Sequence, residues 1–183
     1  MLRLIAIVAL AVMLAACAGQ PVRAPISELP TLRLSPASLG FEMALQQRLQ
    51  VIVGDKSQTL DALLEVDAGE LRLGVQALGQ SALTMRWDGK ELQQRRADWL
   101  PPALSADRVL FDLQLVFWPA DAIRAVLPAN WTLQEAPGRR LLLNAGAEVV
   151  SVEYLTADHA VLKHLREAYL LDVTSTSAAG TVQ

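Results

Sequence analysis

Hydrophobic and polar positions alternate along the chain from residue 41 to residue 53, with Gln47 as the polar exception on the apolar face. A period of two over this length predicts a long antiparallel strand with one buried face. The same pattern returns later in the chain, interrupted by turn sequences such as Asp88-Gly89. Further strands are predicted over residues 58–66, 71–77, 83–87, 92–96, 131–134, 140–144, 148–154, 161–166 and 169–174.

The middle of the chain breaks this strand pattern. Prolines follow Leu100, and Ser105 is a suitable N-cap for a helix over residues 106–117. Apolar residues also alternate within that segment, so a helix and a strand both remain open there. Pro119 predicts a second, short helix over residues 120–127, because proline is favoured at the first position of a helix.

These elements predict a mainly β (α+β) fold, a curved antiparallel half-barrel of about nine or more strands wrapped around inserted helices. So few helices cannot cover a flat sheet of this width, and a curved sheet can leave an apolar cavity. The candidates for lining it are inward-facing apolar residues, including methionines and aromatics that adapt to variable ligands. They are Met43, Leu45, Leu73, Met85, Trp87, Phe111 and Trp118. The alternative is that these side chains form an ordinary packed core.

The first sixteen residues are apolar apart from Arg3, and they are too few to cross a bilayer as a helix. Their pattern predicts a signal peptide over residues 1–16. The sequence Leu14-Ala15-Ala16-Cys17 resembles a bacterial lipobox, which implies that the thiol of Cys17 is lipidated. An ordinary signal peptide is the alternative. Cys17 is the only cysteine of the chain, so no internal disulfide is possible.

The rest of the chain divides by composition. Prolines recur over residues 17–36, which predicts a lipidated cysteine followed by an extended tether. The alternative is an edge strand over residues 31–34 that covers the domain. The folded domain is expected over residues 37–176, followed by a short flexible tail over residues 177–183.

Composition and motifs exclude several classes of function. A net charge of −3 gives no basic surface for nucleic acid. Motifs for serine hydrolases, zinc peptidases, phosphate loops and dinucleotide binding are absent from the sequence. His159 and His164 lack neighbours with metal-ligand spacing, so no metal site is expected. The protein is therefore not expected to be an enzyme or to need a cofactor.

Two stretches carry a family resemblance. Residues 77–80 and 83–89 read Ala-Leu-Gly-Gln and Leu-Thr-Met-Arg-Trp-Asp-Gly, and Trp99-Leu100-Pro101-Pro102 precedes a Trp118-Pro119 pair. They resemble a family of proteobacterial lipoproteins known as domain of unknown function 3261. A more distant resemblance is to LolB, the outer-membrane lipoprotein receptor, and it implies the LolA/LolB half-barrel.

In the LolB family a leucine protrudes from a Leu-Gly turn and helps to deliver acyl chains to the membrane. The resemblance therefore implies an acyl-inserting role for Leu78, which precedes Gly79 in the corresponding turn. From the residues alone, the favoured interpretation is instead that Leu78 folds back onto Trp87 or a neighbouring strand.

The leading hypothesis is a lipid-anchored, periplasm-facing protein of the outer membrane. Ala18, which follows the cysteine, resembles the residue that directs bacterial lipoproteins to the outer membrane. It would bind and transfer acylated cargo, either a lipoprotein or an aryl-polyene-type lipid, with a periplasmic LolA-like carrier as a possible partner. The domain is expected to be monomeric. The alternative is a structural lipoprotein with a solid core that scaffolds a partner complex.

Overall fold

The computed structural model of the chain describes residues 29–100 and 105–178. Within these residues, ten antiparallel strands form one open sheet, and a short 3-10 helix and two α-helices accompany it. The elements in chain order are η2 Pro36–Leu39, β1 Met43–Val53, β2 Lys56–Val66, β3 Leu71–Ala77, β4 Gln80–Trp87, β5 Leu92–Arg96, α2 Ala106–Phe117, α3 Ala120–Val126, β6 Trp131–Ala136, β7 Arg139–Asn144, β8 Ala147–Thr156, β9 His159–His164 and β10 Tyr169–Ser177.

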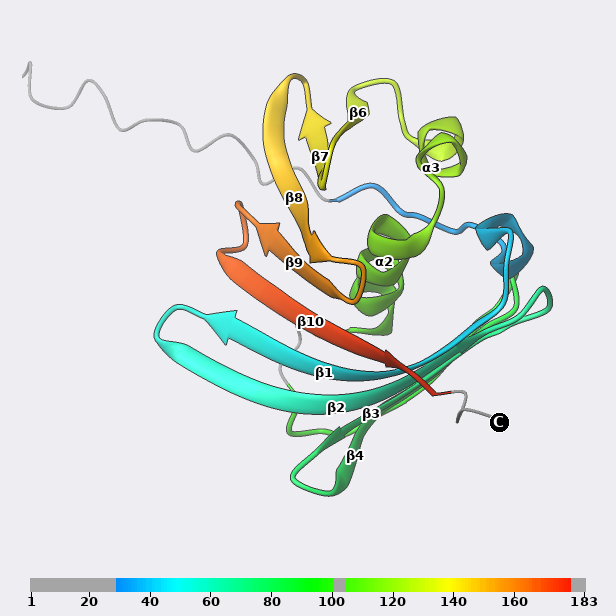
Figure 1. The fold of residues 1–183 in the computed structure, drawn as a ribbon, viewed down its shortest axis with the longest axis vertical. Coiled ribbons are helices and arrows are strands. Elements are labelled where there is room, and N and C mark those ends of the chain that lie inside the picture. Colours follow the sequence, from blue (N-terminus) through cyan, green and yellow to red (C-terminus); the bar gives the residue numbers. More distant parts are fainter. Residues whose placement is uncertain (1–28, 101–104, 179–183) are drawn as a thin grey trace, which may run out of the picture.

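The first and last strands, β1 and β10, lie side by side at the centre of the sheet. The strand order is β5-β4-β3-β2-β1-β10-β9-β8-β7-β6, so two meanders of five strands meet where β1 pairs with β10. The long twisted strands curl the sheet, and α2 lies across its inner face (Figure 1). The predicted mainly β fold is confirmed, and its shape is consistent with a half-barrel.

The segment over residues 106–117 is a helix, which resolves the ambiguity of its alternating pattern. The hydroxyl of Ser105 caps it by accepting a hydrogen bond from the backbone N–H of Arg108 at 3.3 Å. Its buried residues include Leu110, Phe111 and Leu115, which share one side of a helix. A helical face thus accounts for the apolar positions better than a strand with period two.

Gln47, the exception in the first strand pattern, is buried on the inner face. Its amide Nε2 donates to the hydroxyl of Ser175 on β10 at 3.0 Å, which compensates for burying two polar groups. The alternation also places Phe41 and Val53 on the apolar face, but both are exposed, because Phe41 lies two residues before β1 and Val53 is its last residue.

Part of the predicted tether is packed on the domain. Leu32 and Leu34 are buried, and the side-chain amide of Gln114 on α2 bonds both the N–H and the C=O of Leu34. The indole N–H of Trp87 also donates to the Leu34 carbonyl, at 2.7 Å. Residues 29–35 therefore cover the core without joining the sheet, and the packed domain begins before residue 37. Cys17, the predicted signal peptide over residues 1–16 and residues 179–183 lie outside the described residues.

Candidate ligand-binding cavity

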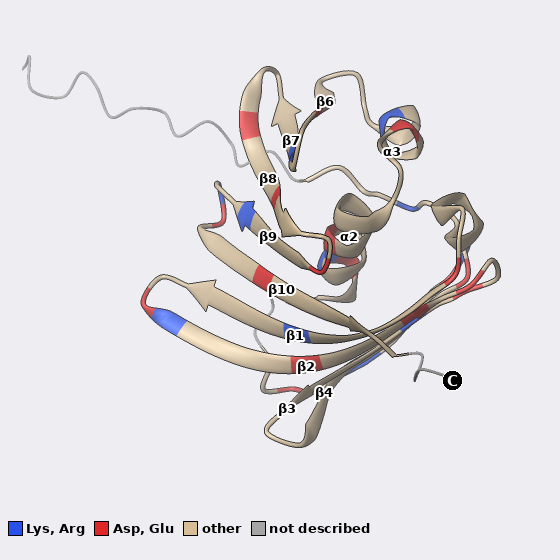
Figure 2. Cartoon of the chain, in the orientation of Figure 1, with Lys and Arg blue, Asp and Glu red and all other residues tan. Residues whose placement is uncertain are grey.

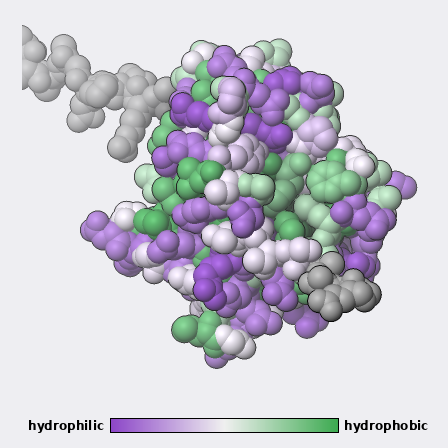
Figure 3. All heavy atoms as spheres, viewed as in Figure 1, coloured by the Kyte–Doolittle hydropathy of each residue, from purple (hydrophilic) through white to green (hydrophobic). Residues whose placement is uncertain are grey.

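A cavity of about 70 Å³ lies between α2 and the inner face of the sheet. Its walls are almost wholly aliphatic, because the inward positions of five strands meet the underside of one helix. The strands and the loop after β5 contribute Gln47, Leu49, Val51, Leu60, Leu73, Val75, Leu83, Leu100, Tyr169, Leu171 and Val173. Figure 3 shows hydrophobic side chains gathered in the hollow between the upper and lower parts of the molecule.

The helix contributes an apolar stripe to the opening of this cavity. Val109, Leu113 and Phe117 stand four residues apart on α2, so they lie on one face. All three are only half-buried, as are Leu49 and Leu171 across from them on the sheet. The cavity therefore has an apolar mouth that is partly open to solvent.

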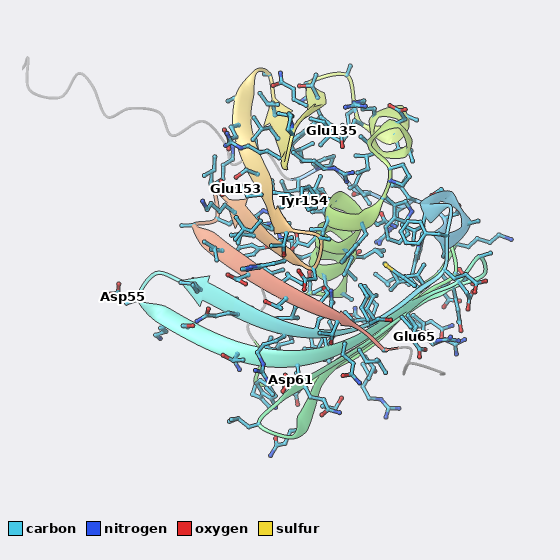
Figure 4. All side chains as sticks on the ribbon, viewed as in Figure 1. Asp55, Asp61, Glu65, Glu135, Glu153 and Tyr154 are labelled. Atoms are coloured by element: carbon cyan, nitrogen blue, oxygen red, sulfur yellow. The ribbon has the colours of Figure 1, made fainter. Side chains whose placement is uncertain are left out.

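The helix that forms the roof is anchored at its C-terminal end. There, Arg140 donates to the carbonyls of Leu115 and Trp118, and the hydroxyl of Tyr154 donates to the carbonyl of Val116 at 2.6 Å. Figure 4 places Tyr154 between β8 and this helix. Because these groups satisfy carbonyls that have no partner within the helix, they hold its end in place.

A buried polar cluster forms one end of the cavity. The carboxylate of Asp112 on α2 accepts a hydrogen bond from the Tyr169 hydroxyl at 2.5 Å. Its other oxygen lies 2.8 Å from Nε2 of His164, and the imidazole stacks on the Tyr169 ring at 4.2 Å between centroids. A carboxylate only accepts, so Nε2 of His164 donates to it. The cluster joins α2 to β9 and β10.

A surface ion pair continues this cluster outward. Arg108 pairs with Glu167, and its guanidinium lies over the rings of Phe111 and Tyr169, at 6.0 and 5.5 Å from their centroids. The described part of the chain holds no group of three histidines, cysteines or carboxylates that could bind a metal ion. The His159 side chain is hydrogen-bonded to that of Asp172 at 2.9 Å, and within the described residues no hydrogen bond or ion pair joins it to the cluster around His164. The arrangement is that of a structural polar network beside an apolar cavity.

Burial raises the pKa of the Tyr169 phenol far above its ordinary value, and the Asp112 carboxylate raises it further. Burial also raises the pKa of Tyr154, the only other tyrosine of the chain. Above about pH 10 the unfolded chain releases these protons while the folded chain keeps them. Stability is therefore expected to be unaffected by these groups below about pH 10 and to fall above it, by up to about 1.4 kcal/mol per pH unit for each tyrosine.

Tyr169→Phe removes one of the two groups that cause this fall. Urea melts of both proteins between about pH 9 and 11 are expected to show a shallower decline for Tyr169→Phe. Tyr154 accounts for the part that remains. Equal slopes for the two proteins would show that the Tyr169 phenol is not shielded in the folded state.

Of the seven residues that the sequence suggested for the cavity wall, the structure places only one in it. Leu73 lines the cavity, while Met43 and Leu45 pack half-buried against the core elsewhere. The other four are buried outside the cavity wall, and they are Met85, Trp87, Phe111 and Trp118.

The two tryptophans are withdrawn from the cavity for a specific reason. Their indole N–H groups need acceptors, and residues 34–38 supply these as backbone carbonyls and the Ser38 hydroxyl. The sequence alone missed Leu113, Phe117 and the polar Asp112, although the spacing of four along a helix carried the signal for the first two.

Leu78 is fully exposed at the tip of the β3–β4 hairpin, so it does not fold back onto Trp87. Both central residues of the turn have positive φ, +50° for Leu78 and +75° for Gly79. Such turns favour asparagine or glycine at the first position, because a larger L-residue is strained there. A leucine that is both strained and exposed has no structural explanation within the domain, which makes it a candidate functional residue.

The described structure thus defines a class of protein, a mainly β domain whose curled open sheet and one covering helix enclose an apolar cavity. A family model described as protein of unknown function (DUF3261) matches residues 44–177. That is well over half of the chain, so the chain belongs to this family. A comparison with curated proteins finds no match. Within the described residues, neither helix is long and apolar enough to cross a membrane.

Proposed function

We propose that this protein is a lipid-anchored protein of the outer membrane, facing the periplasm, that binds and transfers an acylated molecule. The observation that carries the proposal is the apolar cavity between α2 and the sheet. Its mouth is partly open to solvent and is lined by Val109, Leu113 and Phe117 of that helix. The lipobox-like sequence around Cys17 supports the anchor, and the exposed Leu78 supports delivery of an acyl chain. No bond is broken in this function, and no cofactor is needed.

The driving force is burial of the acyl chain, worth about 0.8 kcal/mol for each methylene group. Cargo would be a lipoprotein or an aryl-polyene-type lipid, received from a periplasmic carrier similar to LolA. An acyl chain enters only by pushing aside the half-buried side chains at the mouth, since a cavity that holds one benzene has about 150 Å³. The transfer mechanism is therefore an exchange of the chain between two apolar sites.

The small volume of about 70 Å³ favours a second candidate function. In that case the core is effectively solid, and the protein is a structural lipoprotein that scaffolds a partner complex. The two candidates differ in whether lipid is bound. A mass spectrum of lipid extracted from the purified protein is expected to show acyl species for a carrier and none for a scaffold.

Val109→Trp tests the cavity by filling its mouth. We expect this change to weaken binding of a fluorescent long-chain fatty acid about tenfold, because the indole occupies space for roughly two methylene groups. Val126→Trp is the matched control, a valine on α3 that is exposed outside the cavity. Binding is measured by titration, and urea melts confirm that both variants fold. Equal binding by the two variants would place the probe elsewhere and remove this cavity from the mechanism.

Leu78→Glu tests delivery. Because Leu78 contacts nothing, the free energy of unfolding is expected to stay within about 0.5 kcal/mol of the wild-type value. Transfer of acyl cargo to vesicles is expected to fall, since a carboxylate is costly to desolvate at the membrane. Leu155→Glu, at an exposed leucine on β8, is the control and should transfer normally. Normal transfer by a stable Leu78→Glu protein would assign Leu78 no role.

A further inference from the structure

The connections at one end of the sheet carry a set of exposed apolar side chains. In an antiparallel meander, successive connections alternate between the two ends of the sheet, so those after β1, β3, β5, β7 and β9 share one end. The β7–β8 turn, Ala145-Gly146, carries no large apolar residue. Each of the other four connections presents one, and we call these four residues the apolar rim. The apolar rim consists of Val53, Leu78, Trp99 and Leu165.

All four residues of the apolar rim are about half-exposed or fully exposed. Figure 1 shows the β1–β2, β3–β4 and β9–β10 connections along one side of the molecule, from its left edge to its lowest point. Asp55, labelled in Figure 4, marks the β1–β2 turn on that side. Backbone hydrogen bonds hold the segments of Trp99 and Leu165 at the same end. The N–H of Ala97 donates to the carbonyl of Ala82 near the start of β4, and the N–H of Leu165 donates to that of Val149 near the start of β8.

The opposite end of the sheet is acidic. Its turns contain Asp67, Glu70, Asp88, Glu91 and Asp158, and Figure 2 shows acidic residues gathered at the right-hand end of the β2–β3 hairpin. Backbone N–H donors in the turns lower the pKa of Asp67 and Asp88, so both stay ionised at neutral pH. Arg72 and Arg86 pair with Glu70, and Lys90 lies between Asp88 and Glu91, so the net charge of this end is only weakly negative and it exposes no large apolar side chain in these turns.

Cations accompany the apolar rim instead. Lys56, Arg95 and Arg166 lie beside it, and none of the three makes an ion pair within the described residues. The acidic residues there are Asp55, Asp98 and Glu167, and because Glu167 is paired with Arg108, an excess of positive charge remains. This charge is complementary to a surface that contains anionic phospholipid, which attracts lysine and arginine near it.

The form of the apolar rim fits a bilayer better than a protein. A protein interface has a contiguous apolar core, whereas these side chains stand apart on four separate connections. Isolated apolar tips can each enter the headgroup region, and tryptophan prefers that depth because its ring is amphipathic. The cavity lies at the same end, since its lining residues Val51, Leu100 and Tyr169 are one to four residues from the rim.

We propose that the apolar rim is a membrane-docking surface, which inserts into the headgroup region of a phospholipid bilayer and sets this end of the sheet against the membrane. The surface extends beyond Leu78 to three further connections. It is independent of cargo, because docking does not require the cavity to take up a ligand.

The tryptophans of the chain make a direct test possible. Trp99 is the exposed one, while Trp87, Trp118 and Trp131 are buried. The purified full chain, in the form that the cell produces, is reconstituted in vesicles of phosphatidylethanolamine and phosphatidylglycerol with brominated acyl chains, which quench tryptophan at short range. We expect partial quenching of the wild-type emission and its loss in Trp99→Phe, whose remaining tryptophans are out of reach.

A second pair of variants separates insertion from simple tethering. Val53→Ser/Leu78→Ser/Leu165→Ser keeps Trp99 and is expected to lose the quenching. Phe41→Ser/Leu155→Ser changes two exposed residues outside the rim and is expected to keep it. Urea melts check that both fold. These results leave the test of the cavity untouched, because no substituted residue lines it.

Three outcomes would overturn the proposal. The first is an absence of Trp99 quenching in the wild type, and the second is quenching that persists in the triple variant. The third is a concentration-dependent shift of Trp99 emission without lipid, accompanied by a dimer in sedimentation, because the rim would then bind a second copy of the chain.

Discussion

Asp112→Ala is expected to lower the free energy of unfolding by about 2 to 6 kcal/mol, because it leaves two buried donors without their acceptor. The Asp112 carboxylate is the acceptor for both the Tyr169 hydroxyl and Nε2 of His164, and all three residues are buried. Without it, two donors lose their partner in a site that water does not reach. Each unsatisfied buried donor costs about 1 to 3 kcal/mol.

Urea melts at neutral pH measure this effect, and Asp112→Asn is the matched control. The amide keeps the shape and one acceptor oxygen, so we expect a smaller loss, about 1 to 3 kcal/mol. A cycle that combines Asp112→Ala with Tyr169→Phe should show strong coupling, since the two residues share one hydrogen bond. Losses below about 1 kcal/mol in Asp112→Ala would mean that water replaces the carboxylate.

Cys17→Ala is expected to abolish incorporation of labelled palmitate completely and to leave an unlipidated or uncleaved precursor. The reason is chemical, because the thiol of Cys17 is the proposed acceptor and the chain has no other cysteine. Metabolic labelling followed by cell fractionation measures both effects. Ser27→Ala removes a different nucleophilic side chain from the same stretch and should keep the label. A wild-type protein that takes up no label would contradict the lipid anchor.

Much of the local structure follows from neighbouring residues. Alternation with period two gave the strand over residues 71–77 with its observed bounds, and Ser105 marked the start of α2. Pro119 likewise marked the start of the short helix α3. In each case the decisive physical cause is local: a pleated backbone with one buried face, or a cap on unpaired N–H groups.

The candidate site was only partly predictable. Leu73 was found because every inward position of a strand is a candidate for the wall. Phe117 and Leu113 were missed because the apolar pattern of residues 106–117 fits both a strand and a helix. Which of the two forms decides which side chains of this segment face the sheet. Leu78 could be singled out from its turn, but its full exposure depends on the absence of any neighbour at the hairpin tip.

The sequence by itself determined the mainly β class, the position of the short helix α3, the lack of any disulfide and the lipobox-like N-terminus. Tertiary structure alone decided the cavity and its polar end, because these depend on residues far apart in the chain. Asp112 meets His164 and Tyr169 across 52 and 57 residues, and Gln47 meets Ser175 across 128. It also decided that residues 29–36 pack on the core, where Gln114 and Trp87 bond the backbone of Leu34. A hydrophobic pattern shows which face of a strand or helix is buried. Contacts between residues far apart in the chain determine which other element covers that face and how much space remains between the two elements.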